Sequence, residues 1–365
     1  MTTATLNARR KLLRSAALLV LFGTAACASA GMPRATPGSN VAESQVRHVM
    51  SVLADDSLEG RMTGSRGSAS AATFIAAQMA AAGVTPAGDS GYFQRVPMAL
   101  TRRSNGQDRL TLLTDFAALD TFPANRRRPG VNVVGMIRGS DPALSSQVVL
   151  VDAHYDHLGI GRAVNGDSIY NGADDDASGT TAVIEIARSI AAGPPPRRSI
   201  LFVATTGEEV GLLGTRWFIA HPPVSLNSIV ANLEIEMIGR PDSLAGGPGR
   251  AWLTGYDRTT MGASFAAAGL PIVADARPTE HFFERSDNIA YARMGIPAQT
   301  LSTFNLHSDY HRPSDELSRI DFKHMTRVID AAVSAVRILA DGPVPQWRAG
   351  GRPVAPTAPQ TPTPR

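Results

Sequence analysis

The stretch QVVLVDAHYD, residues 147–156, joins an apolar run to a polar cluster at a single boundary. Its first seven residues are rich in valine and leucine, which is typical of a strand buried on both faces of a sheet. His154 and Asp156 follow directly. A carboxylate two residues beyond a histidine can accept the second imidazole N–H and hold the ring in one tautomer. The stretch therefore indicates a strand that delivers a metal ligand, although His154 could instead be a polar residue where a strand leaves the sheet.

Similar apolar runs recur along the chain, and helical patterns lie between them. We expect strands at residues 131–137, 147–153, 199–205 and 229–235, and helices at 176–192 and 212–220. This alternation predicts an α/β fold, an open, mixed and mostly parallel sheet with helices on both faces. Such sheets bind ligands beyond the carboxyl ends of their strands.

Two more helices are expected to bracket this sheet along the chain, at residues 66–82 and 321–341. The second has apolar residues at spacings of three and four, which is the helical period. Asp321 is placed to cap its start and Gly342 to end it.

Acidic residues follow two of the other predicted strands. Glu208 and Glu209 come after residues 199–205, and Glu236 comes after residues 229–235. Adjacent residues that leave a strand point in different directions, so one of the paired glutamates could bind a metal while the other faces the reacting water. The alternative for the pair is a solvated acidic turn before a helix. Glu234 shares the strand face of Glu236, so the spacing leaves open which of these two is a ligand.

Two loops contribute further candidates. Asp174, Asp175 and Asp176 are consecutive carboxylates, which repel one another unless a cation offsets their charge. The alternative for this run is a turn in which Asp176 caps the following helix. His307 and His311 share the loop LHSDYHRPSD, where a lone histidine would more often be structural than a ligand.

The candidates thus combine imidazoles and carboxylates, with one carboxylate more than a pair of ions needs. In chain order they are His154, Asp174, Glu208, Glu209, Glu236 and His311. This set and order would suit a two-zinc hydrolase site in which the extra carboxylate acts as a base.

Four motifs carry a family resemblance: NGADDDASG, TTGEEVGLLG, EMIGRP and YHRPSDE. Together they resemble the co-catalytic di-zinc aminopeptidases, a zinc peptidase family that also includes glutamate carboxypeptidase, glutaminyl cyclases and transferrin receptor ectodomains. The resemblance spans about residues 45–341. It includes LADDSLEGRMTGSRG, residues 53–67, which is similar to the start of secreted bacterial members. It implies a zinc aminopeptidase-like or phosphorylase-like three-layer sandwich.

The resemblance also implies a role for each candidate. Asp174, the first of the three aspartates, would bridge two zinc ions, and Asp175 would follow a peptide bond that is cis in the family. The remaining roles are as follows: His154 and Glu236 on one zinc, Glu209 and His311 on the other, Glu208 as general base, and Asp156 as the partner of His154. His311 is preferred to His307 because the family's ligand lies four residues before an aspartate, here Asp315.

The expected cofactors are two Zn²⁺ per chain, and another divalent ion could replace zinc. The resemblance implies a metal-dependent exopeptidase that removes N-terminal residues from peptides. Glu236 departs from the aspartate of many members, and glutaminyl cyclases also use glutamate there, so a glutaminyl-peptide cyclotransferase is one alternative. A non-catalytic binding module, like the receptor members, is another. Asn288 stands where related bacterial sequences often have histidine, which leaves any substrate role at this position open.

Substrate preference is expected to depend on residues 241–302. Phe282 and Phe283 lie in this region and could line a specificity pocket, but they could equally belong to the core.

Residues 1–27 have the pattern of an export signal, with a basic start followed by the apolar run 16–22. That run is too short to span a bilayer comfortably. Cys27 is the only cysteine, and its setting resembles a bacterial lipobox in which Thr24 replaces the usual leucine. The alternative is ordinary signal cleavage after Ala28 or Ala30, which would remove Cys27. Both interpretations predict export to the periplasmic side without a disulfide, as an outer-membrane lipoprotein or as a periplasmic or secreted protein.

The expected partners are peptides, with membrane contact only through a lipid on Cys27. The formal charge of +3 falls to −1 without residues 1–26, which hold four basic and no acidic residues. The sequence therefore predicts no nucleic-acid partner. We expect a linker at 28–44, the di-zinc peptidase domain at 45–341 and a Pro-rich disordered tail at 342–365.

Overall fold

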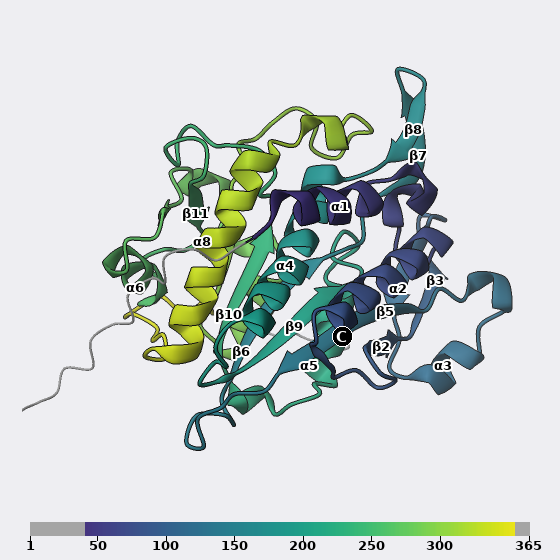
Figure 1. Ribbon diagram of the computed structural model, residues 1–365. Coiled ribbons are helices and arrows are strands. Elements are labelled where there is room, and N and C mark those ends of the chain that lie inside the picture. The colour runs from purple at the N-terminus through teal and green to yellow at the C-terminus, as the bar shows by residue number, and fades with distance from the viewer. Residues whose placement is uncertain (1–40, 355–365) are drawn as a thin grey trace, which may run out of the picture. The chain divides into compact units, whose positions relative to one another are not determined.

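The computed structural model describes residues 41–354 (Figure 1). The predicted signal segment with Cys27, most of the predicted linker, and residues 355–365 of the predicted tail lie outside the described residues. Among the residues described, no helix combines the length and the apolar character needed to cross a membrane.

A nine-stranded mixed sheet forms the centre of the described chain. Its order is β1-β5-β9-β6-β10-β13-β11-β12, with β2 also paired to β5. The four central strands β9, β6, β10 and β13 are parallel, whereas β5 is antiparallel to β9 and β11 is antiparallel to β13. The strands are β1 (Thr85–Pro86), β2 (Phe93–Val96), β5 (Gly130–Ile137), β6 (Val148–His154), β9 (Ser199–Thr205), β10 (Ile229–Glu236), β11 (Ala251–Leu253), β12 (Ile272–Ala274) and β13 (Ala298–Ser302).

Helices cover both faces of this sheet (Figure 1). One face carries α1 (Glu43–Leu53), α2 (Arg66–Ala81), α4 (Gly179–Ala192) and α8 (Phe322–Asp341). The other face carries α5 (Leu213–Ala220) and α7 (Asn288–Met294). The described residues also include the short helices α3 (Phe116–Asp120) and α6 (Met261–Ala267).

Strand β6 shows why the sheet is buried on both sides. Val149 and Val151 pack into the apolar cluster beneath α4 and α8, while Val148 and Leu150 pack into the cluster beneath α5 and α7. Successive side chains of a strand point to opposite faces, so an unbroken apolar run fills both cores. The predicted α/β fold class is confirmed, as are the four predicted strands to within one residue at each end.

Two hairpins stand apart from the main sheet. They are formed by β3 (Met98–Arg102) with β4 (Asp108–Leu112), and by β7 (Gly159–Val164) with β8 (Asp167–Tyr170). The second hairpin leads directly into the loop that holds the three consecutive aspartates.

Part of the predicted C-terminal tail is packed against the domain rather than free of it. Trp347 donates a hydrogen bond from Nε1 to the carbonyl of Gly295 at 2.8 Å, and its backbone pairs with Thr259. The large apolar indole gains from this burial, which a composition rich in proline does not reveal. The helix α8 agrees with its prediction, since the Asp321 carboxylate accepts a hydrogen bond from the His324 N–H at 3.0 Å.

Candidate metal centre

The carboxyl ends of three parallel strands deliver acidic and imidazole side chains to one edge of the sheet. His154 is the last residue of β6 and Glu236 the last residue of β10. Glu208 and Glu209 follow the end of β9 by three and four residues. Because β6 lies between β9 and β10 in the sheet, these four side chains converge at its central strands.

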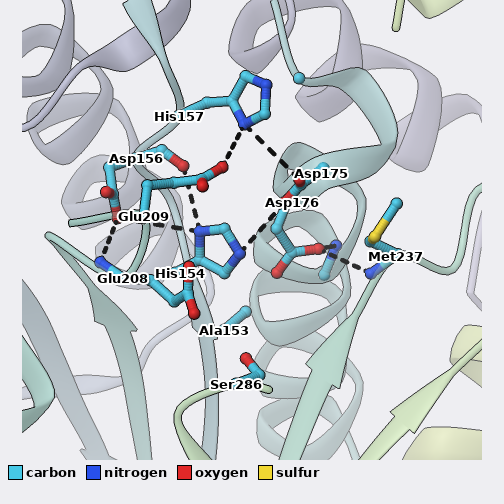
Figure 2. Close-up of polar contacts among 12 residues, drawn as sticks. Ala153, His154, Asp156, His157, Asp175, Asp176, Glu208, Glu209, Met237 and Ser286 are labelled. Atoms are coloured by element: carbon cyan, nitrogen blue, oxygen red, sulfur yellow. Dashed lines mark hydrogen bonds and ion pairs between the residues drawn. The ribbon is translucent and has the colours of Figure 1, made fainter. Parts of the chain in front are cut away.

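Asp175 lies at the middle of this cluster (Figure 2). Its Oδ1 is 3.4 Å from His154 Nε2, and its Oδ2 is 3.1 Å from His311 Nε2. The same His311 nitrogen lies 3.2 Å from Glu209 Oε2. Ligand atoms of Asp175, His154 and Glu236 all lie within 4.8 Å of one another. Asp175 therefore faces two groups of donors, one on each side.

Asp174, which the resemblance pointed to as the bridging residue, faces away from the cluster. Its Oδ1 accepts a hydrogen bond from the Gly239 N–H at 2.7 Å, and its Oδ2 lies 3.0 Å from His307 Nε2. It is fully buried, with Arg240 Nε at 4.0 Å. Asp174 therefore lies outside the two groups of candidate ligands, because its carboxylate is held by the loop that follows β10.

The third aspartate has a structural contact of its own. Asp176 Oδ1 accepts hydrogen bonds from the Gly179 N–H at 2.8 Å and the Met237 N–H at 3.0 Å, so it ties the start of α4 to the end of β10 (Figure 2). The cis peptide bond joins Asp175 to Asp176, one residue later than the resemblance implied. The helix α4 begins at Gly179 rather than at residue 176, because the backbone angles of Asp175 and Asp176 are not helical.

Asp315 fixes the register of this aspartate run. Its carboxylate accepts hydrogen bonds from the backbone N–H groups of Asp174 and Asp175 at 3.0–3.1 Å, and from Arg240 Nη2 at 3.1 Å. From the sequence, Asp315 indicated only that His311 rather than His307 was the expected ligand. In the structure it holds the backbone that presents Asp175.

His157 is the residue of the cluster to which the sequence assigned no role. Its Nδ1 lies 2.7 Å from Glu209 Oε1 and 3.9 Å from Asp175 Oδ2, and its side chain is buried (Figure 2). Its ring also meets that of His311 edge to face, with centroids 5.6 Å apart. The signal was present in the motif HYDH, which carries a second histidine three residues after the first.

Asp156 differs in detail from its expected role. The Nδ1 of His154 lies 3.1 Å from the backbone carbonyl of Asp156, whereas the Asp156 carboxylate is 3.8 Å away. That carboxylate instead accepts hydrogen bonds from the Thr63 hydroxyl at 2.9 Å and from the Glu208 N–H at 3.2 Å. Asp156 therefore connects the loop of His154 to the backbone of Glu208.

Burial dominates the electrostatics of the cluster. It raises the pKa of Glu208 well above its usual range. Burial, reinforced by Glu234, raises the pKa of Glu236 to about 8. Burial alone would lower the pKa of His154, but neighbouring carboxylates, above all Asp175, raise that pKa well above its usual range. Without a cation, these groups therefore retain protons that a bound cation would displace.

Several buried atoms of the cluster form no hydrogen bond within the described chain, although some of them lie as close together as ion pairs do. They are Asp175 Oδ2, Glu209 Oε1, His311 Nε2, and both ring nitrogens of His157. Buried polar atoms are rarely left unpaired, and each costs about 1–3 kcal/mol when it is. These atoms come from carboxylates and imidazoles, which are zinc ligands. The residues present therefore fit a metal ion.

An aromatic pocket with a volume of about 30 Å³ opens beside Glu236. Phe282 stacks on Trp252 with ring centroids 5.0 Å apart, and it meets Phe304 edge to face at 5.8 Å. Tyr310 continues this wall and stacks on the ring of His311 at 3.9 Å. Phe283 belongs instead to the apolar cluster beneath α5 and α7, although it also borders a second pocket.

Comparison with known proteins identifies the fold and the family. The crystal structure of a zinc aminopeptidase from Bacillus subtilis matches 83% of this chain and 96% of its own, with a TM-score of 0.60 and 15% identity. A glutaminyl cyclase from Porphyromonas gingivalis matches 81% of this chain and 97% of its own, with a TM-score of 0.56 and 15% identity.

A curated relative, the leupeptin-inactivating enzyme 1 of Streptomyces exfoliatus, is 28% identical over 254 residues, which are 62% of this chain. The match spans 52% of that enzyme, so this chain corresponds to about half its length. The model of peptidase family M28 matches residues 132–336, from β5 to α8, and so includes the strand ends and loops that form the cluster. The chain belongs to peptidase family M28.

Proposed function

We propose that this protein is a zinc-dependent aminopeptidase that binds two ions. The observation that carries the proposal is the position of Asp175, which faces His154 and Glu236 on one side and Glu209 and His311 on the other. A shared carboxylate between two sets of donors is what a pair of metal ions requires. Asp175 takes the bridging role here in place of Asp174.

His311 is proposed as the ligand of the second ion in preference to His157. His311 Nε2 lies at 3.1–3.2 Å from both Asp175 and Glu209, which are separations that ligands of one ion share. Ligand atoms of His157, Asp175 and Glu209 also lie within 4.8 Å of one another, but His157 Nδ1 is 2.7 Å from Glu209 and 3.9 Å from Asp175, so we assign it the role of orienting the Glu209 carboxylate.

When bound, zinc supplies Lewis acidity, which lowers the pKa of water and polarises a peptide carbonyl. Glu208 provides the base. Its carboxylate has no hydrogen-bond partner within residues 41–354, and its backbone N–H is held by Asp156. Glu208 would accept a proton from the attacking water and pass it to the leaving amine.

The shape of the pocket beside the cluster supports removal of N-terminal residues rather than internal cleavage. Glu236 lines the aromatic pocket, and its charge acts on the buried carboxylate of Glu208. The pocket walled by Trp252 and Phe282 has a volume of only about 30 Å³, which is too small for an extended peptide. Arg285 lies 5.0 Å from the ring centre of Phe282 at the same pocket.

The test uses protein beginning at residue 28, stripped of metal, reloaded with zinc and incubated with a mixed peptide library. Mass spectrometry should find loss of single N-terminal residues only in the zinc-loaded sample. Loss of ammonia from peptides with N-terminal glutamine would identify a glutaminyl cyclase instead. An unchanged library with zinc bound would favour a binding module.

A further inference from the structure

Arg61 is a buried arginine that the mechanism above does not use. It ends the short helical turn Asp56–Arg61, and its side chain is only 1% exposed. The ion pairs found in residues 41–354 do not include Arg61. Its guanidinium instead donates hydrogen bonds to backbone carbonyls, namely Tyr155 O at 2.7 Å, Leu53 O at 2.5 Å, Asn171 O at 2.5 Å and Gly172 O at 2.9 Å.

Three of these carbonyls belong to two of the segments that carry candidate metal ligands, those of His154 and Asp175. Tyr155 lies between His154 and Asp156, at the end of β6. Asn171 and Gly172 begin the loop that presents Asp175. The fourth carbonyl belongs to Leu53 at the end of α1. One rigid planar group therefore connects both ligand loops to each other and to a helix.

Neighbouring residues reinforce this connection. The side chain of Asn171 donates hydrogen bonds to Asp56 Oδ1 at 2.7 Å and to Glu316 Oε1 at 2.9 Å. Thr63, two residues after Arg61, donates to the Asp156 carboxylate at 2.9 Å. Gly60 allows close approach, because a Cβ at this position would collide with the carbonyl oxygen of Tyr170. Segment 56–63 thus contacts both loops through side chains and backbone.

A charged guanidinium is costly to bury, and the negative charges of Asp156, Asp175, Asp176 and Asp315 offset part of that cost for Arg61 without a direct ion pair. Lysine has a single nitrogen, so it could not reach four carbonyls that surround a planar fork. The backbone of the two loops would then lose its common anchor. Metal ligands need their supporting contacts to hold the geometry that the ion requires.

We propose that Arg61 is a positioning residue for the metal centre, and that its guanidinium sets zinc affinity by fixing the His154 loop against the Asp175 loop. This inference rests on the proposed function, because it takes those residues as zinc ligands. It assigns a role to the LADDSLEGRMTGSRG stretch, which lies outside the family match at residues 132–336.

The experiment measures zinc affinity at 25 °C by competition with a chromophoric chelator, for wild type, Arg61→Lys and Arg61→Met. Both variants should bind zinc about 10- to 100-fold more weakly than wild type, the range that follows loss of a contact supporting a ligand. The lysine variant separates hydrogen bonding from charge, because it keeps a cation. Affinity equal to wild type in a folded Arg61→Lys protein overturns the proposal.

Arg198 offers a matched control. It is also buried, at 4% exposure, and its Nη1 donates to the carbonyls of Leu339, Ala340 and Gly342. It precedes β9, so it lies at the opposite edge of the sheet from the candidate ligands. Arg198→Lys and Arg198→Met should lower thermal stability and leave zinc affinity unchanged. An equal loss of zinc affinity in both sets would show a general effect of destabilisation and reject the positioning role.

Asn171→Ala decides the question if the Arg61 variants do not fold. It removes the side-chain hydrogen bonds that Asn171 donates to Asp56 and Glu316, and it should also weaken zinc binding. Unchanged zinc affinity would reject the proposal. Failure of wild type itself to bind zinc would instead refute the proposed function, so the two failures are distinct.

Discussion

Exchanging one oxygen for nitrogen at two adjacent aspartates tests which of them belongs to the metal centre. Asp175→Asn and Asp174→Asn are isosteric changes, so neither leaves a cavity. The amide nitrogen of asparagine cannot ligate zinc, and Asp175 faces both donor groups. Asp175→Asn should therefore reduce zinc from two ions per chain to at most one.

The expected loss of activity follows from the same geometry. Loss of a residue that merely supports a ligand lowers metal affinity or activity about 10- to 100-fold. Loss of a shared ligand should exceed that range, so we expect Asp175→Asn to hydrolyse substrate more than about 100-fold more slowly than wild type.

Asp174→Asn should behave differently. The carboxylate at this position accepts from Gly239 at 2.7 Å and lies 3.0 Å from His307. An asparagine keeps one oxygen that can accept a hydrogen bond, but it loses one buried polar contact of the carboxylate. This loss costs about 1–3 kcal/mol of stability. A domain with a typical stability of about 5–15 kcal/mol stays folded, so zinc content should be close to wild type.

The assay combines metal analysis after dialysis against buffered free zinc, thermal unfolding with and without chelator, and hydrolysis of a chromogenic amino-acid anilide. The reasoning is refuted if Asp174→Asn loses zinc and activity while Asp175→Asn keeps both. Loss of zinc from neither variant would count against a two-ion centre at this loop.

Four further predictions address the base, the pH dependence of stability, proton release on zinc binding, and the pocket. Glu208→Gln should slow turnover roughly 10²- to 10⁴-fold with zinc content unchanged, and a variant that keeps most of its rate would contradict the base assignment. In metal-free protein, the pKa of Glu236 is raised to about 8 from an ordinary 4.5 and that of His311 to about 10 from 6.5. The folded state therefore binds more protons than the unfolded state between about pH 4.5 and 10, and its stability should fall as pH rises through this window. Zinc binding at neutral pH should release protons. Calorimetry in buffers of different ionisation enthalpy detects this release, and a heat of zinc binding that does not depend on the buffer would contradict the prediction. Phe282→Ala should widen the aromatic pocket and shift cleavage of the peptide library toward larger N-terminal residues, at a cost of about 3 kcal/mol of stability. Phe283→Ala should also lower stability but leave the preference for N-terminal residues unchanged.

Much of the sheet could be predicted from the sequence because its central strands are buried on both faces. A continuous apolar run such as the one in β6 is typical of a strand in a parallel sheet, and helical periods between such runs strengthen that prediction. Elements that escaped prediction are shorter or more polar. Strand β13 includes Gln299 and Thr300, which are buried through hydrogen bonds rather than apolar character. Helix α1 begins at Glu43, inside the stretch that composition assigned to the linker.

The candidate site shows where the sequence alone becomes insufficient. It indicated the loops that carry His154, Glu209 and His311, because each motif combines a strand end or turn with a donor side chain. It could not choose among three identical aspartates, since side-chain chemistry is the same at all three positions. The choice depends on Asp315, which holds the backbone of the run from a loop about 140 residues away. Only the folded structure brings that constraint to the site.

The charge distribution gives a reason for the arrangement as a whole. Burial of carboxylates is unfavourable unless they are protonated, hydrogen-bonded or paired with a cation. Asp174 and Asp176 are hydrogen-bonded to backbone N–H groups, and Arg61 contributes one fixed positive charge nearby. Asp175 and Glu209 have histidines as their neighbours, and each has one carboxylate oxygen without a hydrogen-bond partner in the described chain. Backbone N–H groups therefore stabilise Asp174 and one oxygen of Asp176, although Asp176 Oδ2 has no partner in the described chain, whereas the unpaired atoms of the proposed ligands are left to be satisfied by a metal.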